Sequence, residues 1–514
     1  MNNAPAIFRA LITYAVCVPL AIFVGYLVTN PLDYSSLATY GVLGFLFIFP
    51  LLMRWHYPLL VFSWAAPITL FFFKGSPSLW LALVVVSLGI SIIERILIPN
   101  RHFISVPQMT RPSICLVAVV LLTAKLTGGI GLHTFGSEVG GGRKYLFLLI
   151  GILSYFAITA QPIPPGKAKW YVALFFLGQM TALVGDLYPF APSFLHPIFW
   201  LFPSGVNMTD FQAGAVRMPG TGSACIGLCL WMLARYGVRG IFLEDKRWRP
   251  FLWIAGFMLI FLGGYRSAVF MVFVSFVIMF FMEGVHRTRF VLVLAFAGML
   301  AAVAAVPLAS HLPYSVQRAL SFLPLNISLE AKNSADDSTA WRLKMWAALW
   351  PKVPQYLLLG KGLAITADDY QLMGSDVSIK SIDASEQGLA LSGDYHNGIL
   401  SVLIPFGLWG LIAYAWFMAA GLWVLYNNWK NGPPALQTVN MLMFGLCLMD
   451  FLLFASCKAG MWITLGIGYW AGHVGLSVAL NNGVCRKKSP AVSAEHPVFK
   501  PSRMLSRLRP GLQQ

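Results

Sequence analysis

The feature that most constrains this chain is a succession of long apolar runs, separated by short polar turns. Charged residues make up 11% of the 514 residues and hydrophobic residues 58%, whereas soluble domains carry roughly a quarter charged residues. A chain so poor in charge cannot cover itself with a polar surface, and runs of about 20 apolar residues cross a bilayer as helices. The sequence therefore predicts an all-α polytopic membrane protein.

The run lengths predict about 12–14 transmembrane helices. The candidate spans are residues 8–28, 40–53, 58–73, 79–98, 112–130, 145–160, 170–187, 221–233, 251–265, 267–282, 290–309, 399–425, 439–454 and 461–480. One long polar segment interrupts them. This segment divides the chain into N-terminal spans (1–309), a polar loop (310–396), C-terminal spans (397–480) and a basic tail (481–514).

The basic residues of the short loops orient the spans. With the N-terminus and the tail placed in the cytoplasm, the cytoplasmic side receives Arg54, Arg95, Lys167 and the basic cluster at 235–249, as the positive-inside bias requires. The opposite, outer side receives the loop 310–396. The net charge of +17 is scattered between spans in this arrangement, so we interpret it as membrane topology and expect no nucleic-acid partner.

The polar loop at 310–396 differs in kind from the other connections. It holds nine of the nineteen acidic residues. Large apolar side chains recur at three- and four-residue spacing between 339 and 356, which predicts a helix capped by Ser338 or Thr339. Gly360-Lys361-Gly362 indicates a turn after this helix. We expect a mostly helical cap over the outer face of the membrane.

Several ionisable residues converge on that face in the predicted topology, although such residues are costly in membrane segments and are often functional. They are Lys125, Arg217, Arg266, Arg342, Lys344, His396, Asp450 and Lys458. Structural alternatives exist for some of them. Asp450 could form an ion pair with Lys125 or Lys458, and Arg217 or Lys458 could extend to phospholipid headgroups.

A lipid diphosphate is the substrate class that suits such a set. Arginine guanidinium groups bind diphosphate oxygens bidentately and neutralise the charge that develops on a leaving group. A neutral histidine can accept the proton of an attacking hydroxyl. No acidic pair has metal-ligand spacing beside these residues, and the cysteines lie mostly in apolar runs. We therefore expect a metal-independent mechanism without a cofactor or zinc site.

Four short motifs between residues 205 and 425 resemble the O-antigen ligase and polymerase superfamily of bacterial inner-membrane glycosyltransferases. They are Arg217-Met218-Pro219-Gly220, Gly264-Tyr265-Arg266-Ser267-Ala268, Arg342-x-x-x-Trp346 with Leu359-Gly360-Lys361-Gly362, and His396-Asn397-Gly398 with Gly407-x-x-Gly410. Each motif alone is weak, but their order and shared face make the set fairly specific.

The resemblance implies a GT-C-like membrane fold and an inverting transfer of a glycan from undecaprenyl diphosphate to an acceptor hydroxyl at the periplasmic face. The acceptor would be lipid A core or a growing polysaccharide, in contact with membrane lipids. The resemblance gives His396, Arg266 and Arg342 catalytic roles. Substrate-binding roles are expected for Arg217, Asn397, Tyr395 and Trp346, which lie in the motifs, and for Lys458 and Asp450, which the predicted topology places near the same face.

The motifs leave three acceptors open, because ligases, polymerases and protein O-glycosylating enzymes share donor and chemistry. A transporter of lipid-linked glycans is a different class of function, in which the arginines would bind diphosphate without bond breaking. Such a protein is expected to show internal repeats, and the sequence shows none. A scaffold within a polysaccharide export complex is a third hypothesis.

Overall fold

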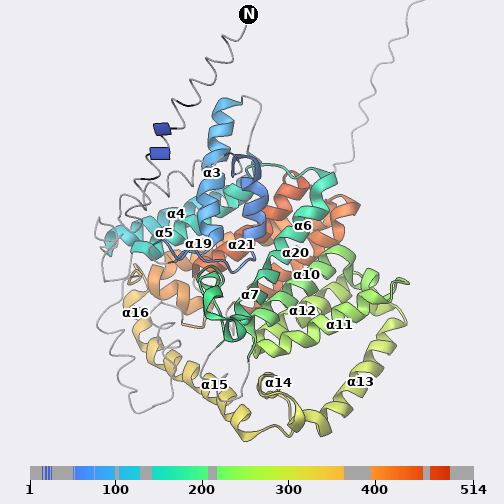
Figure 1. The fold of residues 1–514 in the computed structure, drawn as a ribbon. Coiled ribbons are helices and arrows are strands. Elements are labelled where there is room, and N and C mark those ends of the chain that lie inside the picture. The colour runs from blue at the N-terminus through green and yellow to red at the C-terminus, as the bar shows by residue number, and fades with distance from the viewer. Residues whose placement is uncertain are drawn as a thin grey trace, which may run out of the picture.

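The computed structural model is a bundle of helices (Figure 1). It describes residues 14, 18–19, 21–22, 25, 50, 52–73, 76–98, 103–127, 142–206, 217–363, 395–454 and 463–486. The expected spans at 8–28 and 40–53 lie mostly outside these residues, as do the tail after 486 and Lys458. In the described ranges every regular element is a helix, with a single isolated bridge between Thr69 and Ser78.

The helices follow the apolar runs of the sequence closely. The α-helices used below are α3 (Leu79–Leu97), α4 (Pro107–Leu126), α5 (Gly142–Ile158), α6 (Ala168–Leu177), α7 (Leu183–Asp186), α10 (Pro219–Phe242), α11 (Trp248–Ile260), α12 (Arg266–Met282), α13 (Phe290–Leu308), α14 (Tyr314–Ala319), α15 (Leu329–Leu349), α16 (Val353–Tyr356), α19 (Gly398–Asn431), α20 (Gln437–Leu453) and α21 (Ile463–Asn481). Two 3-10 turns matter as well, η3 (Gly178–Ala182) and η6 (Phe261–Gly263).

Six helical segments of the described chain are long and apolar enough to cross a membrane. They are Leu79–Leu97, Pro107–Leu126, Pro165–Phe190, Pro219–Phe242, Gly398–Asn431 and Pro434–Leu453. The predicted all-α polytopic fold is confirmed. The span expected at 170–187 is assembled from α6, η3 and α7 in succession rather than from one regular helix.

The core lies between helices that are distant in sequence. α21 packs against α5, and α19 lies against both α4 and α20. α10 packs against α11, α12 and α20. The largest side chains that this packing buries fully include Trp470, Tyr155 and Phe417. The C-terminal helices therefore lie within the bundle built by the N-terminal half.

The long helix α19 is broken near its start. Gly407 has φ +64°, a left-handed value that glycine adopts readily. The segment after α16 supplies the hydrogen bonds that this break removes. The amides of Lys361 and Gly362 donate to the carbonyls of Ile404 and Pro405 at 2.9 and 3.0 Å, and the Leu408 amide donates to the Leu357 carbonyl at 2.7 Å. The turn predicted at Gly360–Gly362 thus serves to seat the cap on α19.

Replacing Gly407 by alanine is expected to destabilise the protein by about 1–3 kcal/mol, the usual cost of a strained backbone conformation. A Cβ at this position would also lie 2.7 Å from the Leu358 carbonyl oxygen. Thermal unfolding of the purified variant in detergent measures the effect. Gly298→Ala is the matched control, because a Cβ there meets nothing within 4 Å. Equal melting temperatures for the two variants would contradict this account of the break.

The polar loop is helical in its described part, with α14 and α15 along the lower edge of Figure 1 and α16 at its left side. The expected helix start at Ser338 or Thr339 is wrong. α15 begins ten residues earlier, and Ser328 caps it by accepting a hydrogen bond from the Ala331 amide at 3.3 Å. The apolar side chains that the first turns of α15 bury are the small Ala331 and Ala335, so this stretch lacks the recurring large apolar residues from which a helix is predicted.

Candidate functional site

The His-Asn motif forms the start of α19. Asn397 is the N-cap, and its side-chain oxygen accepts a hydrogen bond from the Leu400 amide at 3.1 Å, a role that asparagine fills well. The Gly398 amide donates to the Phe454 carbonyl at 3.1 Å. A Cβ on Gly398 would lie 2.4 Å from that carbonyl oxygen, so glycine is required here. His396, with φ +48°, is thereby turned away from the helix path.

α15 is fixed to this motif by two aromatic residues. The indole nitrogen of Trp346 donates to the Tyr395 carbonyl at 2.8 Å, and the Tyr395 amide donates to the Ser401 hydroxyl at 3.2 Å. Tyr395 is 4% exposed and packs in a small core with Leu349 and Leu400. The contacts of Trp346 and Tyr395 therefore hold the cap against α19, and the binding of substrate by these residues stays a prediction.

Arg342 lies one helical turn before Trp346, on the same face of α15. Burial and the nearby Arg342 charge together lower the pKa of His396 to about 4. The imidazole is consequently neutral at pH 7, in the state that accepts a proton. Arg342 thus lies close enough to His396 for its charge to act on the imidazole, and a shared role of the two residues in one site stays a prediction.

The Arg217 and Arg266 motifs also lie against each other. The Met218 amide donates to the Leu262 carbonyl at 3.0 Å. The side chain of Arg217 passes Gly264, where a Cβ would lie 3.4 Å from the Arg217 Cδ. The Arg217 guanidinium carbon lies 5.9 Å from the centre of the Tyr314 ring in α14. These contacts place Arg217 beside the turn from which Arg266 begins α12.

Arg266 connects α12 to the cap. Its two terminal nitrogens donate to the Ser321 hydroxyl at 3.3 Å and to the Ala335 carbonyl at 3.2 Å. Ala335 lies seven positions before Arg342 on α15, or about 10 Å along the helix axis at 1.5 Å per residue. One helix therefore links the Arg217 and Arg266 pair to Arg342 and His396. This end of the bundle carries all four groups.

Asp186 is a functional neighbour that the sequence analysis did not single out. This carboxylate at the end of α7 is 2% exposed. It accepts the Gly220 amide at 2.9 Å, the Thr221 amide at 2.5 Å and the Thr221 hydroxyl at 2.8 Å. It therefore caps α10 from another helix, directly after Arg217. The sequence does contain a signal for this cap, because an acidic residue, Asp186, ends an apolar run that precedes the Arg-x-x-Gly motif.

Asp186→Ala is expected to lower the free energy of unfolding by about 1–2 kcal/mol through loss of the cap. It should also disturb the position of Arg217, because the first turn of α10 is no longer held by Asp186. The melting temperature in detergent measures the first effect. The exposed Asp245→Ala variant is the control for the loss of a carboxylate. An unchanged melting temperature in Asp186→Ala would show that the cap contributes nothing.

The remaining predicted residues fall outside this group. Asp450 is 5% exposed and accepts a hydrogen bond from the Trp470 indole at 2.7 Å. It lies on α20 one turn before Phe454, whose carbonyl receives the Gly398 amide. Asp450 therefore lies beneath the His-Asn motif, within the bundle. Lys125 is exposed at the end of α4, and Lys458 lies outside the described residues.

Comparison with known proteins identifies one segment of the chain. A family model described as O-antigen ligase matches residues 250–415, about a third of the 514 residues. The match runs from α11 through the cap to the kinked start of α19, and it contains Arg266, Arg342 and His396. No curated protein matches the chain. Residues 250–415 are thus similar to the O-antigen ligase family, consistent with the superfamily that the sequence motifs resemble.

Proposed function

We propose that this protein transfers a glycan from undecaprenyl diphosphate to an acceptor hydroxyl, as an O-antigen ligase does. The observation that carries this proposal is the arrangement of α15. It holds Arg342 beside a neutral His396 at one end and receives Arg266 at the other. The family match over residues 250–415 supports a membrane enzyme that acts on lipid-linked polysaccharide.

The residues divide between the two halves of the reaction. The acceptor hydroxyl loses its proton to His396 while its oxygen attacks the anomeric carbon of the glycan. The bond between that carbon and the diphosphate oxygen breaks on the opposite face, and the diphosphate leaves with the electron pair. Arg217, Arg266 and Arg342 neutralise the charge of the leaving group. The configuration is inverted, and arginines take the part that a divalent metal plays elsewhere.

The proposed setting is the bacterial inner membrane, with both termini in the cytoplasm and the site at the periplasmic face. The donor is an undecaprenyl-diphosphate-linked glycan, and the acceptor is lipid A core. The family match and the apolar spans support a membrane-embedded donor. A polymerase of O-antigen or exopolysaccharide units is the alternative, since it differs from a ligase only in the acceptor.

Polysaccharide gels of a strain lacking the gene, with and without a plasmid copy, test the proposal. A ligase predicts bare lipid A core and an accumulated lipid-linked polymer, both corrected by the plasmid. Core capped with a single repeat unit would assign the polymerase alternative instead. An unchanged ladder would contradict a role in lipopolysaccharide and redirect the search to exopolysaccharide or a protein acceptor.

The proposed base role predicts a defined pH dependence. Because the pKa of His396 is lowered to about 4, its imidazole stays neutral between pH 6 and 8. Protonation of His396 should therefore leave kcat/KM constant over that range, and kcat/KM should fall as the pH approaches 4. Arg342 repels the protonated imidazole, so Arg342→Gln should raise the pKa and move the acidic limb to higher pH. The pH–rate profile of the residual activity measures this shift. An acidic limb that stays at the same pH in Arg342→Gln would contradict the proposed effect of Arg342 on the pKa of His396.

A further inference from the structure

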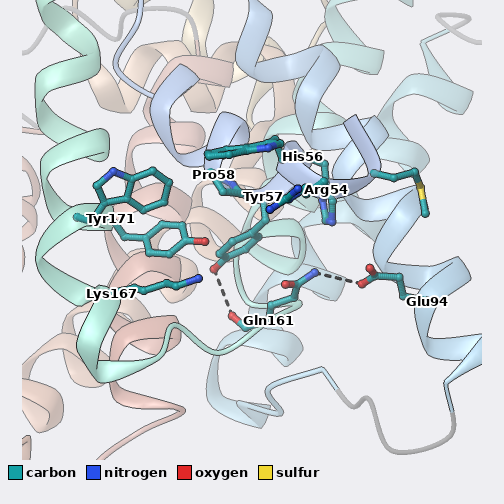
Figure 2. A pocket seen from close by; sticks show the side chains of 11 residues that line it. Arg54, His56, Tyr57, Pro58, Glu94, Gln161, Lys167 and Tyr171 are labelled. Carbon is teal, nitrogen blue, oxygen red and sulfur yellow. Dashed lines mark hydrogen bonds between the residues drawn. The ribbon is translucent and has the colours of Figure 1, made fainter. Parts of the chain in front are cut away.

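A cavity of about 620 Å³ lies where the helical residues 53–58 meet the ends of α3 and α5 and the start of α6 (Figure 2). Its side chains include two cations, Arg54 and Lys167, and one carboxylate, Glu94. Cavities of about 300–1,000 Å³ are typical of small-ligand sites. None of the residues proposed for glycan transfer lines this cavity.

The connectivity places the cavity at the end of the bundle opposite to the candidate site. α6, η3 and α7 run in succession from Lys167, at the cavity, to Asp186, which caps α10 beside Arg217. α5 likewise starts near the cap, where the Tyr145 hydroxyl accepts the Leu363 amide at 3.0 Å. It ends at Ile158, whose carbonyl accepts the Tyr57 hydroxyl at 2.7 Å. The cavity is therefore a separate site.

The cations of the cavity suit a phosphate group. Arg54 and Lys167 are both exposed at the cavity, and they come from segments more than one hundred positions apart. An arginine fork and a lysine ammonium together offer several donors to phosphate oxygens. The positive-inside bias accounts for basic residues on this side of the membrane; what points to a ligand is that both cations line the same cavity, while neither takes part in the proposed glycan transfer.

The aromatic residues beside these cations indicate that the ligand reaches the cavity from the membrane. Trp55 and Trp170 line the cavity and are 41% and 42% exposed, with ring centres 6.4 Å apart in an edge-to-face contact. Each tryptophan follows a basic residue of the same segment closely in sequence. Tryptophan is enriched at the level of lipid headgroups because its ring is amphipathic.

Glu94 restricts the kind of phosphate that fits. Figure 2 shows Lys167 and Glu94 on opposite sides of the labelled group of side chains. The Gln161 amide nitrogen donates to Glu94 at 3.3 Å, which orients the carboxylate. An ionised carboxylate accepts about four hydrogen bonds and repels further negative charge. It therefore disfavours a bare phosphate and favours a phosphodiester whose alcohol carries an amine or hydroxyl.

We propose that this cavity binds the headgroup of one bilayer glycerophospholipid, with the phosphate at Arg54 and Lys167 and the amine or hydroxyl of the head alcohol at Glu94. The acyl chains leave past Trp55 and Trp170 into the bilayer. The bound lipid fastens the helical segment 53–58 to α3 and α6. This site is independent of the glycan transfer proposed above.

Native mass spectrometry of the delipidated full-length protein tests the proposal with three added lipids. Phosphatidylethanolamine and phosphatidylglycerol should each leave one tightly bound lipid, whereas phosphatidylcholine, whose head alcohol has no hydrogen-bond donor, should bind more weakly. Glu94→Gln should remove this preference. Phosphatidylcholine bound as tightly as the other two by the unaltered protein would overturn the role of Glu94 and the proposed headgroup orientation.

A matched pair of double variants tests the phosphate contacts. Arg54→Gln with Lys167→Gln should weaken lipid binding at least about tenfold, since each charged hydrogen bond contributes more than 1 kcal/mol. Arg95→Gln with Lys169→Gln removes two exposed cations outside the cavity and should leave binding unchanged. Equal loss of lipid binding in both double variants would mean that the basic residues attract lipid nonspecifically, and would contradict the proposed site. If soluble glycerophosphoethanolamine stabilised the protein as much as phosphatidylethanolamine does, the assignment to a bilayer lipid would be overturned.

Discussion

His396→Ala is expected to reduce glycan transfer by about 100- to 10,000-fold, the range that a positioned general base contributes. Burial and the Arg342 charge lower the pKa of His396 to about 4, so it is neutral under working conditions. The substitution removes this proton acceptor. It also places alanine at a left-handed backbone position, with φ +48°, which histidine and asparagine tolerate better. Polysaccharide product from membranes that contain equal amounts of protein measures the loss.

Two companion variants make this result specific. His396→Asn keeps a polar side chain that tolerates the left-handed backbone, so it should insert and fold normally while losing transfer. His311→Ala alters an exposed histidine of the cap and should transfer at the original rate. Normal product from His396→Ala or His396→Asn would remove His396 from the mechanism.

Arg266→Lys is expected to reduce transfer by about 100- to 1,000-fold, the range for losing one group that stabilises developing charge. The Arg266 guanidinium reaches both the Ser321 hydroxyl and the Ala335 carbonyl. A lysine ammonium has a single nitrogen and cannot span these acceptors while it also contacts a diphosphate. Because the substitution keeps the positive charge, the loss of transfer measures how much the planar geometry of the guanidinium contributes.

Arg289→Lys is the control for Arg266→Lys, because Arg289 is an exposed arginine that precedes α13 at the other end of α12. It should leave both transfer and melting temperature unchanged. The melting temperature of Arg266→Lys separates two causes, since a purely structural tie would lower stability and activity together. Near-normal turnover in Arg266→Lys would make Arg266 an interfacial anchor only.

The sequence predicted the helical membrane fold because apolar runs of spanning length have few other outcomes in a bilayer. It also predicted that Arg342 and His396 lie on the same face, and their shared role in one site stays a prediction. The start of α15 was missed because the buried side chains of its first turns are the small Ala331 and Ala335. Helix length in such a stretch depends on the Ser328 cap and on contacts made elsewhere in the fold.

Other features of the site depend on tertiary contacts that sequence patterns do not contain. The capping of α10 by Asp186 joins residues more than thirty positions apart. The fit of Gly360–Gly362 into the break at Gly407 depends on how α19 bends. The capping role of Asn397 was available from sequence, because asparagine before an apolar run is a preferred N-cap. The resemblance to a catalytic motif directed attention to substrate instead.

Reconstituted transfer tests the central claim most directly. The purified protein is placed in proteoliposomes with an undecaprenyl-diphosphate-linked glycan and lipid A core, and both the glycosylated acceptor and the released undecaprenyl diphosphate are measured. The proposed mechanism predicts equal amounts of the two products, and neither product from His396→Asn. Donor that stays intact, or that only changes leaflet, in the presence of the unaltered protein would contradict glycan transfer and favour a transporter.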